Sequence, residues 1–146
     1  MGMDTSPLTD ADAALLDHAT DVNRETFDPD FFDGAHIVAA SVRTTDGELY
    51  DGVSLPASIG RASTCAEPGA VSAAIADGYA HDEIEACVAV AYPMPDHDAG
   101  EPRPIPPCGV CRELLADYNP EMRVVVPIDG ENRTVRAGDL LPARPW

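Results

Sequence analysis

The spacing of apolar residues changes along the chain, and each change marks a boundary between predicted elements. Over residues 8–27 apolar residues recur every three or four positions, which predicts a helix that Thr9 can cap. The apolar face of this helix is expected to comprise Ala11, Leu15, Ala19 and Val22. Two further helices are predicted over about 65–78 and 108–118. Gly78 gives the second helix an end, because glycine adopts the left-handed backbone that follows many helices.

Five extended segments accompany these helices. They cover residues 36–45, 48–55, 84–92, 122–128 and 133–136. Asp46-Gly47 and Asp129-Gly130 each stand between two of them, and Asp-Gly pairs are typical of hairpin turns. The segment 84–92 is almost continuously apolar, which predicts a buried central strand.

The order of these elements predicts an α/β fold in which helices cover a sheet. It runs helix, strand, strand, helix, strand, helix, strand, strand. Residues 93–107 interrupt this order, since they hold six prolines and are expected to form an irregular loop. The length of 146 residues suits a single domain over residues 1–146.

The composition is strongly acidic. The formal net charge is −17, and all nine basic residues are arginines. Such a surface repels phosphate backbones, so no nucleic-acid partner is expected. Acidic residues spread along the whole chain favour solubility in a salty cytoplasm, as in halophilic proteins, and predict poor folding at low salt. No apolar run reaches the roughly 20 residues of a membrane span and no signal-peptide pattern is visible, so we expect a cytoplasmic protein with no membrane partner.

Three of the four cysteines lie in two short blocks that begin predicted helices. Cys65 is followed two residues later by Glu67, while Cys108 and Cys111 share one face of the next helix. Helix starts lower thiol pKa values, so three thiolates could hold one zinc ion and leave its fourth position to water. A Cys-x-x-Cys pair alone also fits a redox dithiol or half of a structural zinc site. Cys87, in the apolar segment, is expected to be a buried small hydrophobic residue.

The two blocks, Cys65-Ala66-Glu67 and Pro107-Cys108-Gly109-Val110-Cys111-Arg112, together resemble the three-cysteine form of the cytidine deaminase family of zinc hydrolases. The resemblance covers nearly the whole chain and implies a three-layer α/β/α fold with a mixed five-stranded sheet. It implies a zinc-dependent deaminase that releases ammonia from cytidine or a related aminopyrimidine. In that family the three cysteines hold zinc, the glutamate transfers protons, and the arginine at position 112 tunes the thiolates.

The resemblance also implies substrate contacts and partners. The backbone N–H of Ala66 would bind a ring carbonyl, and Ser54 stands where the family has a ribose-binding asparagine. His36 stands where the family has a base-stacking phenylalanine, and it is either a ring contact or a strand residue satisfied locally. The substrate is expected to be a small molecule and the protein a homotetramer or dimer. Trp146 would enter a neighbouring subunit's pocket or pack against its own core.

Two prolines depart from the family pattern. Pro56 replaces the carboxylate that holds a ribose hydroxyl, and Pro68 replaces an arginine after the glutamate, a loss for which Arg61 is a candidate replacement. A nucleoside with a modified sugar, a free base or another aminated heterocycle is therefore as plausible as cytidine. The alternative hypothesis is a non-catalytic binding protein that keeps the zinc scaffold for stability.

Overall fold

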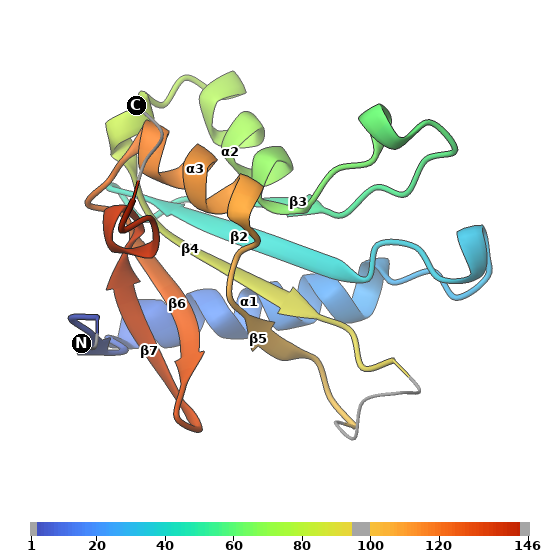
Figure 1. The fold of residues 1–146 in the computed structure, drawn as a ribbon, viewed down its shortest axis with the longest axis horizontal. Coiled ribbons are helices and arrows are strands. Elements are labelled where there is room, and N and C mark those ends of the chain that lie inside the picture. The colour runs from blue at the N-terminus through green and yellow to red at the C-terminus, as the bar shows by residue number, and fades with distance from the viewer. Residues whose placement is uncertain (1–2, 95–99, 144–146) are drawn as a thin grey trace.

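The computed structural model describes residues 3–94 and 100–143, and a mixed β-sheet forms its centre (Figure 1). The strands are β1 (Ser6–Pro7), β2 (Val38–Thr44), β3 (Leu49–Val53), β4 (Ile84–Ala91), β5 (Arg103–Ile105), β6 (Arg123–Ile128) and β7 (Glu131–Arg136). Six of them follow the order β1-β7-β6-β4-β2-β3, and β5 pairs with β4. Among these described strands, β4 and β6 form the one parallel pair. As predicted, β4 is the central strand.

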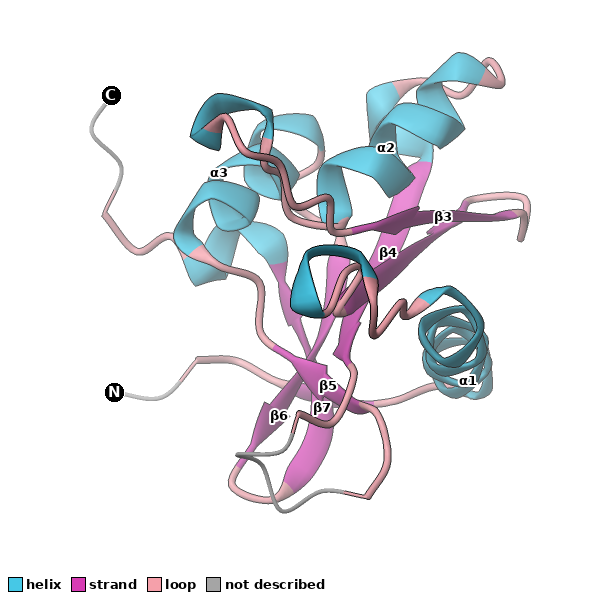
Figure 2. Cartoon of the chain, turned by 90° about the vertical axis from the view of Figure 1, so that its right-hand side faces the viewer, coloured by secondary structure: helices cyan, strands magenta, loops and turns pink. Residues whose placement is uncertain are grey.

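Helices cover both faces of the sheet (Figure 2). They are α1 (Asp10–Thr26), α2 (Glu67–Ala76) and α3 (Gly109–Tyr118), with short 3-10 turns at Phe31–Asp33, Gly60–Ala62, His81–Glu83 and Ala137–Leu140. Helix α1 lies on one face, whereas α2 and α3 lie side by side on the other (Figure 1). This arrangement confirms the predicted three-layer α/β/α fold. Among the described residues, no helix combines the length and the apolar character that a membrane span requires.

The side chains of β4 alternate between two apolar clusters, because successive strand residues point to opposite faces. Val88 and Val90 belong to the cluster that contains Leu15 of α1. Cys87 and Ala89 belong to the larger cluster under α2 and α3. The prediction that Cys87 is a buried small hydrophobic residue is therefore confirmed, since it is 1% exposed.

Over residues 3–94 and 100–143 the sheet has seven strands, so the predicted number of five is wrong by two short strands. One is β1, and the other is β5, which lies within the stretch 93–107 that was expected to be irregular. Segments of two and three residues carry no periodicity that a sequence pattern could show. Pro104 is tolerated in β5 because this strand is paired only with β4, and proline occurs in such edge strands.

Helix α1 buries two polar side chains that the apolar pattern did not predict. Ala11 is exposed, whereas Asp12 and Asn23 are completely buried. The side-chain amide of Asn23 donates to the backbone carbonyls of Ile37 at 3.0 Å and Val90 at 3.3 Å. Burial of a polar group is possible where such hydrogen bonds replace those to water.

Asp12 ties the start of α1 to the sheet. Its carboxylate accepts hydrogen bonds from Arg43, at 3.1 Å, and from Arg123. It also accepts from the backbone N–H of Thr9, whose hydroxyl in turn accepts from the N–H of Asp12, so the predicted cap is confirmed. Burial raises the pKa of Asp12, but the hydrogen bonds from Arg123, Thr9 and Arg43 outweigh it and lower the pKa to about 2.

The predicted turns and the predicted end of α2 are confirmed. Asp129 and Gly130 both have positive φ angles, of 50° and 83°, and connect β6 to β7. Gly78 has a φ of 106° just after α2, where its N–H donates to the carbonyl of Ile75. Glycine suits this position because a side chain would strain the left-handed backbone.

Candidate active site

Three cysteine thiols come together where α2 and α3 begin. Cys65 lies two residues before α2, Cys108 precedes the first residue of α3, and Cys111 lies in the first turn of α3. The Sγ atoms of Cys65 and Cys108, 43 residues apart in sequence, are 3.3 Å from each other. All three sulfur atoms lie within 4.8 Å of one another, and none is in a disulfide. The two cysteine blocks therefore form one cluster.

The distances within this cluster suit a metal ion. A tetrahedral zinc ion with Zn–S bonds of about 2.3 Å holds its sulfur ligands roughly 3.8 Å apart. The Cys65–Cys108 separation of 3.3 Å is close to this value and all three sulfurs lie within 4.8 Å of one another, so small side-chain shifts would bring them onto a common ion. Three soft sulfur donors favour zinc over magnesium or calcium, which prefer oxygen.

The electrostatics of the cluster also favour a cation. Burial raises the pKa of the Cys111 thiol, and the neighbouring Glu67, Cys65 and Cys108 raise it further. Burial and Cys108 likewise raise the pKa of Cys65. For Cys108, burial raises the pKa, but hydrogen bonds from the backbone N–H groups of Cys111 and Val110 and from the thiols of Cys65 and Cys111 together lower it more, so its net shift is downward. Three thiolates side by side repel one another, and a bound cation would remove that repulsion.

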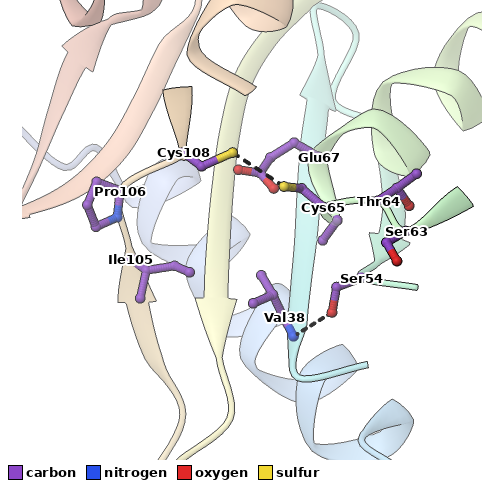
Figure 3. A pocket seen from close by; sticks show the side chains of 10 residues that line it. Val38, Ser54, Ser63, Thr64, Cys65, Glu67, Ile105, Pro106 and Cys108 are labelled. Carbon is purple, nitrogen blue, oxygen red and sulfur yellow. Dashed lines mark hydrogen bonds between the residues drawn. The ribbon is translucent and has the colours of Figure 1, made fainter. Parts of the chain in front are cut away.

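Glu67 is the carboxylic acid of the site. It is the first residue of α2 and only 3% exposed. Figure 3 shows its carboxylate beside the sulfur atoms of Cys65 and Cys108. Burial raises the pKa of Glu67, and hydrogen bonds from the backbone of Glu67 and Ala66 and from the Cys111 thiol offset only part of this effect. A buried carboxyl group with a raised pKa is suited to accept and return a proton.

A cavity of about 480 Å³ opens beside the cysteines and Glu67 (Figure 3). It is lined by Val38, Ser54, Ser63, Thr64, Cys65, Ala66, Glu67, Ile105, Pro106 and Cys108. Ile105 and Pro106 lie on one side of it, opposite the loop that carries Ser63 and Thr64. Its volume is typical of small-molecule sites. None of the lining residues in the described part of the chain is basic, so these residues offer no positive side chain to a phosphate group.

Two of the predicted substrate-binding residues line the cavity, and a third hydrogen-bonds to one of them. Ser54 and Ala66 line the cavity, whereas His36 is not among the lining residues. His36 instead supports Ser54, because its Nδ1 donates to the carbonyl of Ser54 at 2.8 Å. The hydroxyl of Ser54 also accepts a hydrogen bond from the N–H of Val38, at 3.0 Å. His36 precedes β2 and has a φ of 57°, so it is not the strand residue that was expected.

Arg112 and Arg61 make no described contact with the cysteine sulfurs. Arg112 donates from Nε to the carbonyl of Pro107 at 2.8 Å, and no hydrogen bond joins it to a cysteine sulfur in the described part of the chain. Arg61 is exposed in the turn Gly60–Ala62. Trp146 lies outside the described residues. The roles predicted for these three residues stay predictions.

Several cavity residues were missed by reasoning from the sequence. Val38, Ser63 and Thr64 belong to segments without a recognisable motif, and their place depends on how the chain folds back on itself. Ile105 and Pro106 were missed because β5 was not predicted. The prolines immediately before Cys108 were a usable signal, since they fix the path of the chain into the cysteine cluster.

Comparison with known proteins finds similarity along nearly the whole chain. Blasticidin-S deaminase from Bacillus cereus is 32% identical over 142 residues, which are 97% of this chain and 97% of that protein. The structure of cytidine deaminase from Burkholderia pseudomallei has 29% identity and a TM-score of 0.70, covering 92% of this chain and 98% of the other. The Bacillus anthracis cytidine deaminase has a TM-score of 0.71 at 20% identity, covering 91% and 88%, and supports the fold alone. No model of a known protein family matches the chain.

Proposed function

The chain belongs to the cytidine deaminase-like family, and from that premise we propose that it is a zinc-dependent hydrolytic deaminase. The enzyme would replace the amino group of a cytosine compound by oxygen and release ammonia. The observation that supports this proposal most directly is the convergence of Cys65, Cys108 and Cys111 beside the buried Glu67, at a cavity large enough for a small ring.

Glu67 would carry out the proton transfers. When bound by the three cysteines, zinc supplies a Lewis acid that makes a water molecule a stronger nucleophile near neutral pH. The carboxylate of Glu67 would accept a proton from the attacking water and deliver it to the ring nitrogen as the new C–O bond forms. It would then take the second proton from the hydroxyl group of that adduct and pass it to the amino group, so that the C–N bond breaks, a C=O bond forms and ammonia leaves. Pro68 does not disturb this arrangement, because it stands in the first turn of α2, where a missing N–H breaks no hydrogen bond.

The start of α3 would tune the thiolates. Backbone N–H groups of Val110 and Cys111 lower the pKa of Cys108, as expected at the positive end of a helix. Arg112 would act together with them, through the segment whose Pro107 carbonyl it holds.

The lining of the cavity favours an unphosphorylated substrate. It contains the hydroxyl groups of Ser54, Ser63 and Thr64 but no lysine or arginine. Pro56 offers no carboxylate to a ribose hydroxyl, which argues against strict selection of an ordinary ribonucleoside. The relative from Bacillus cereus is a blasticidin-S deaminase. We therefore infer a cytosine compound whose sugar-like part is not held by a carboxylate, and blasticidin S belongs among the first candidates.

A substrate screen at high salt tests this function. Ammonia release is measured for cytosine, cytidine, deoxycytidine, cytidine monophosphate and blasticidin S, with protein that has been loaded with zinc. We expect ammonia from at least one unphosphorylated compound and none from the monophosphate. Treatment with a chelator should abolish turnover, and added zinc should restore it. Stoichiometric zinc without ammonia release from any compound would favour the non-catalytic binding protein instead.

A further inference from the structure

Gly52 of β3 lies directly beneath the first turn of α2. A Cβ atom at this position would lie 2.8 Å from the carbonyl carbon of Gly69, and closer still to the carbonyl oxygen of Ala66 and the backbone nitrogen of Ala70. Those two atoms form the hydrogen bond that begins α2, from Ala70 N–H to the Ala66 carbonyl at 3.4 Å. All three neighbours are backbone atoms, so no flexible side chain could move aside. The start of α2 therefore rests on the backbone of β3.

This contact affects one of the two chain segments that supply the clustered cysteines. Ala66, whose carbonyl meets Gly52, stands between Cys65 and Glu67. The other two sulfurs, of Cys108 and Cys111, belong to α3, and none of the atoms nearest to Gly52 belongs to that helix. A displacement that begins at Gly52 would thus move one sulfur and the carboxylate relative to the remaining sulfurs.

We propose that Gly52 is a positioning residue, which sets the distance between the Cys65–Glu67 segment and the cysteines of α3. This inference rests on the proposed function for its catalytic consequence, but not for its metal-binding consequence. In the variant Gly52→Ala, the first turn of α2 must retreat from β3 by about 1 Å, and a misplacement of that size can cost about 100-fold in rate. The φ angle of Gly52 is not positive, so steric contact rather than backbone strain would cause the change.

Gly69 offers a second, milder probe of the same contact. A Cβ atom at Gly69 would lie 3.3 Å from the Cα of Gly52, a tight contact that a small shift relieves. Alanine also has a higher helix propensity than glycine. The variant Gly69→Ala should therefore keep or raise the melting temperature while it weakens the site. A residue with a merely structural role would not move stability and metal binding in opposite directions.

Cobalt(II) titration gives a readout that is independent of turnover. Thiolate-to-cobalt absorption is followed for the full-length wild-type protein and for Gly52→Ala and Gly69→Ala. Gly60→Ala is the matched glycine control, because a Cβ there meets nothing within 4 Å and the φ angle is not positive. Val125→Ala is the control for lost stability, since Val125 is buried in the cluster on the far face of the sheet.

We expect Gly52→Ala to bind cobalt at least about tenfold more weakly than wild type, with altered absorption. Gly69→Ala should show a smaller loss in the same direction, and both controls should match the wild type. Equal affinity and equal spectra for wild type, Gly52→Ala and Gly69→Ala would overturn the proposal. If Gly52→Ala does not fold, the Gly69→Ala titration decides. A wild-type protein that binds cobalt but deaminates nothing refutes the proposed function and leaves this test intact.

Discussion

Glu67 combines two properties that rarely occur together in a carboxylic acid, namely near-complete burial and a position next to free thiols. Burial would normally be unfavourable for a charged group. Here the cost is reduced because the backbone N–H groups at the start of α2 and the Cys111 thiol hydrogen-bond to the carboxylate. The carboxyl group is therefore held at a fixed place, as the proton transfer proposed for it requires.

The variant Glu67→Gln isolates this proton transfer, since glutamine has nearly the same shape but cannot take up a proton. We expect zinc content and melting temperature close to wild type and a loss of turnover of about 100-fold to 10,000-fold, the range typical of general acid–base catalysis. Zinc is measured by elemental analysis and turnover by ammonia release. Retained activity with a full zinc content would remove Glu67 from the role proposed for it.

At the scale of single residues, the sequence predicted that Cys65, Cys108 and Cys111 lie together, but not the groups that hold the site in place. Cysteines and a glutamate at characteristic spacings can be recognised in a sequence, because few other residue types can bind zinc. His36 shows the limit: its positive φ and its hydrogen bond to the Ser54 carbonyl depend on a loop conformation with no local signal. Gly52 is similar, since nothing in the strand pattern shows that a helix lies against its Cα.

The ion-pair group around Asp12 joins four elements, namely the start of α1, the end of β2, the start of β6 and β4. Arg43 and Arg123 both donate to its carboxylate, and Glu85 of β4 lies 3.6 Å from Arg43. The helical pattern of apolar residues could not predict this group, because a buried carboxylate contradicts that pattern and becomes stable only with its distant partners. Long, periodic elements such as α1 and β4 were predictable, whereas β1 and β5 are too short to show a period.

Acid should weaken this ion-pair group. The pKa of Asp12 is about 2 in the folded protein and 3.8 as an unperturbed group. Because the folded pKa is the lower one, the unfolded chain binds the proton more readily. The stabilisation is therefore complete above about pH 4 and is lost as the pH falls through about 2, a contribution of about 2 kcal/mol. Urea unfolding at several pH values measures it.

The variant Asp12→Asn should remove both the charge and its pH dependence. We expect the free energy of unfolding at pH 7 to fall by about 3 kcal/mol, because the buried Arg43 and the half-buried Arg123 both lose their charged partner. Asp17→Asn, at an exposed position of the same helix, is the control and should change little. Equal acid sensitivity in wild type and Asp12→Asn would show that other groups control the transition.

At the scale of the whole molecule, the charge of −17 acts against the compact state. Ion pairs such as Arg136 with Glu121 offset only a small part of it, since nine arginines face 26 acidic residues. The predicted dimer or tetramer and the cytoplasmic location stay predictions, because neither follows from one chain.

Salt should stabilise the protein. Screening shortens the range of the repulsion from about 10 Å at 0.1 M to about 3 Å at 1 M. A gain of 1 to 2 kcal/mol would raise the melting temperature by roughly 3 to 8 °C for a chain of this size. Thermal unfolding in increasing potassium chloride at pH 7 measures this rise. A melting temperature that does not change with salt would contradict it.

The division of the apolar interior by the sheet has a practical consequence for engineering. Leu15, Val88 and Val125 form a cluster behind the sheet, and the cysteines, Glu67 and the cavity all lie in front of it. Stabilising substitutions can therefore be sought in the rear layer while the reacting groups keep their geometry. Variants chosen there would alter how long the enzyme survives heating, and not which compound it converts.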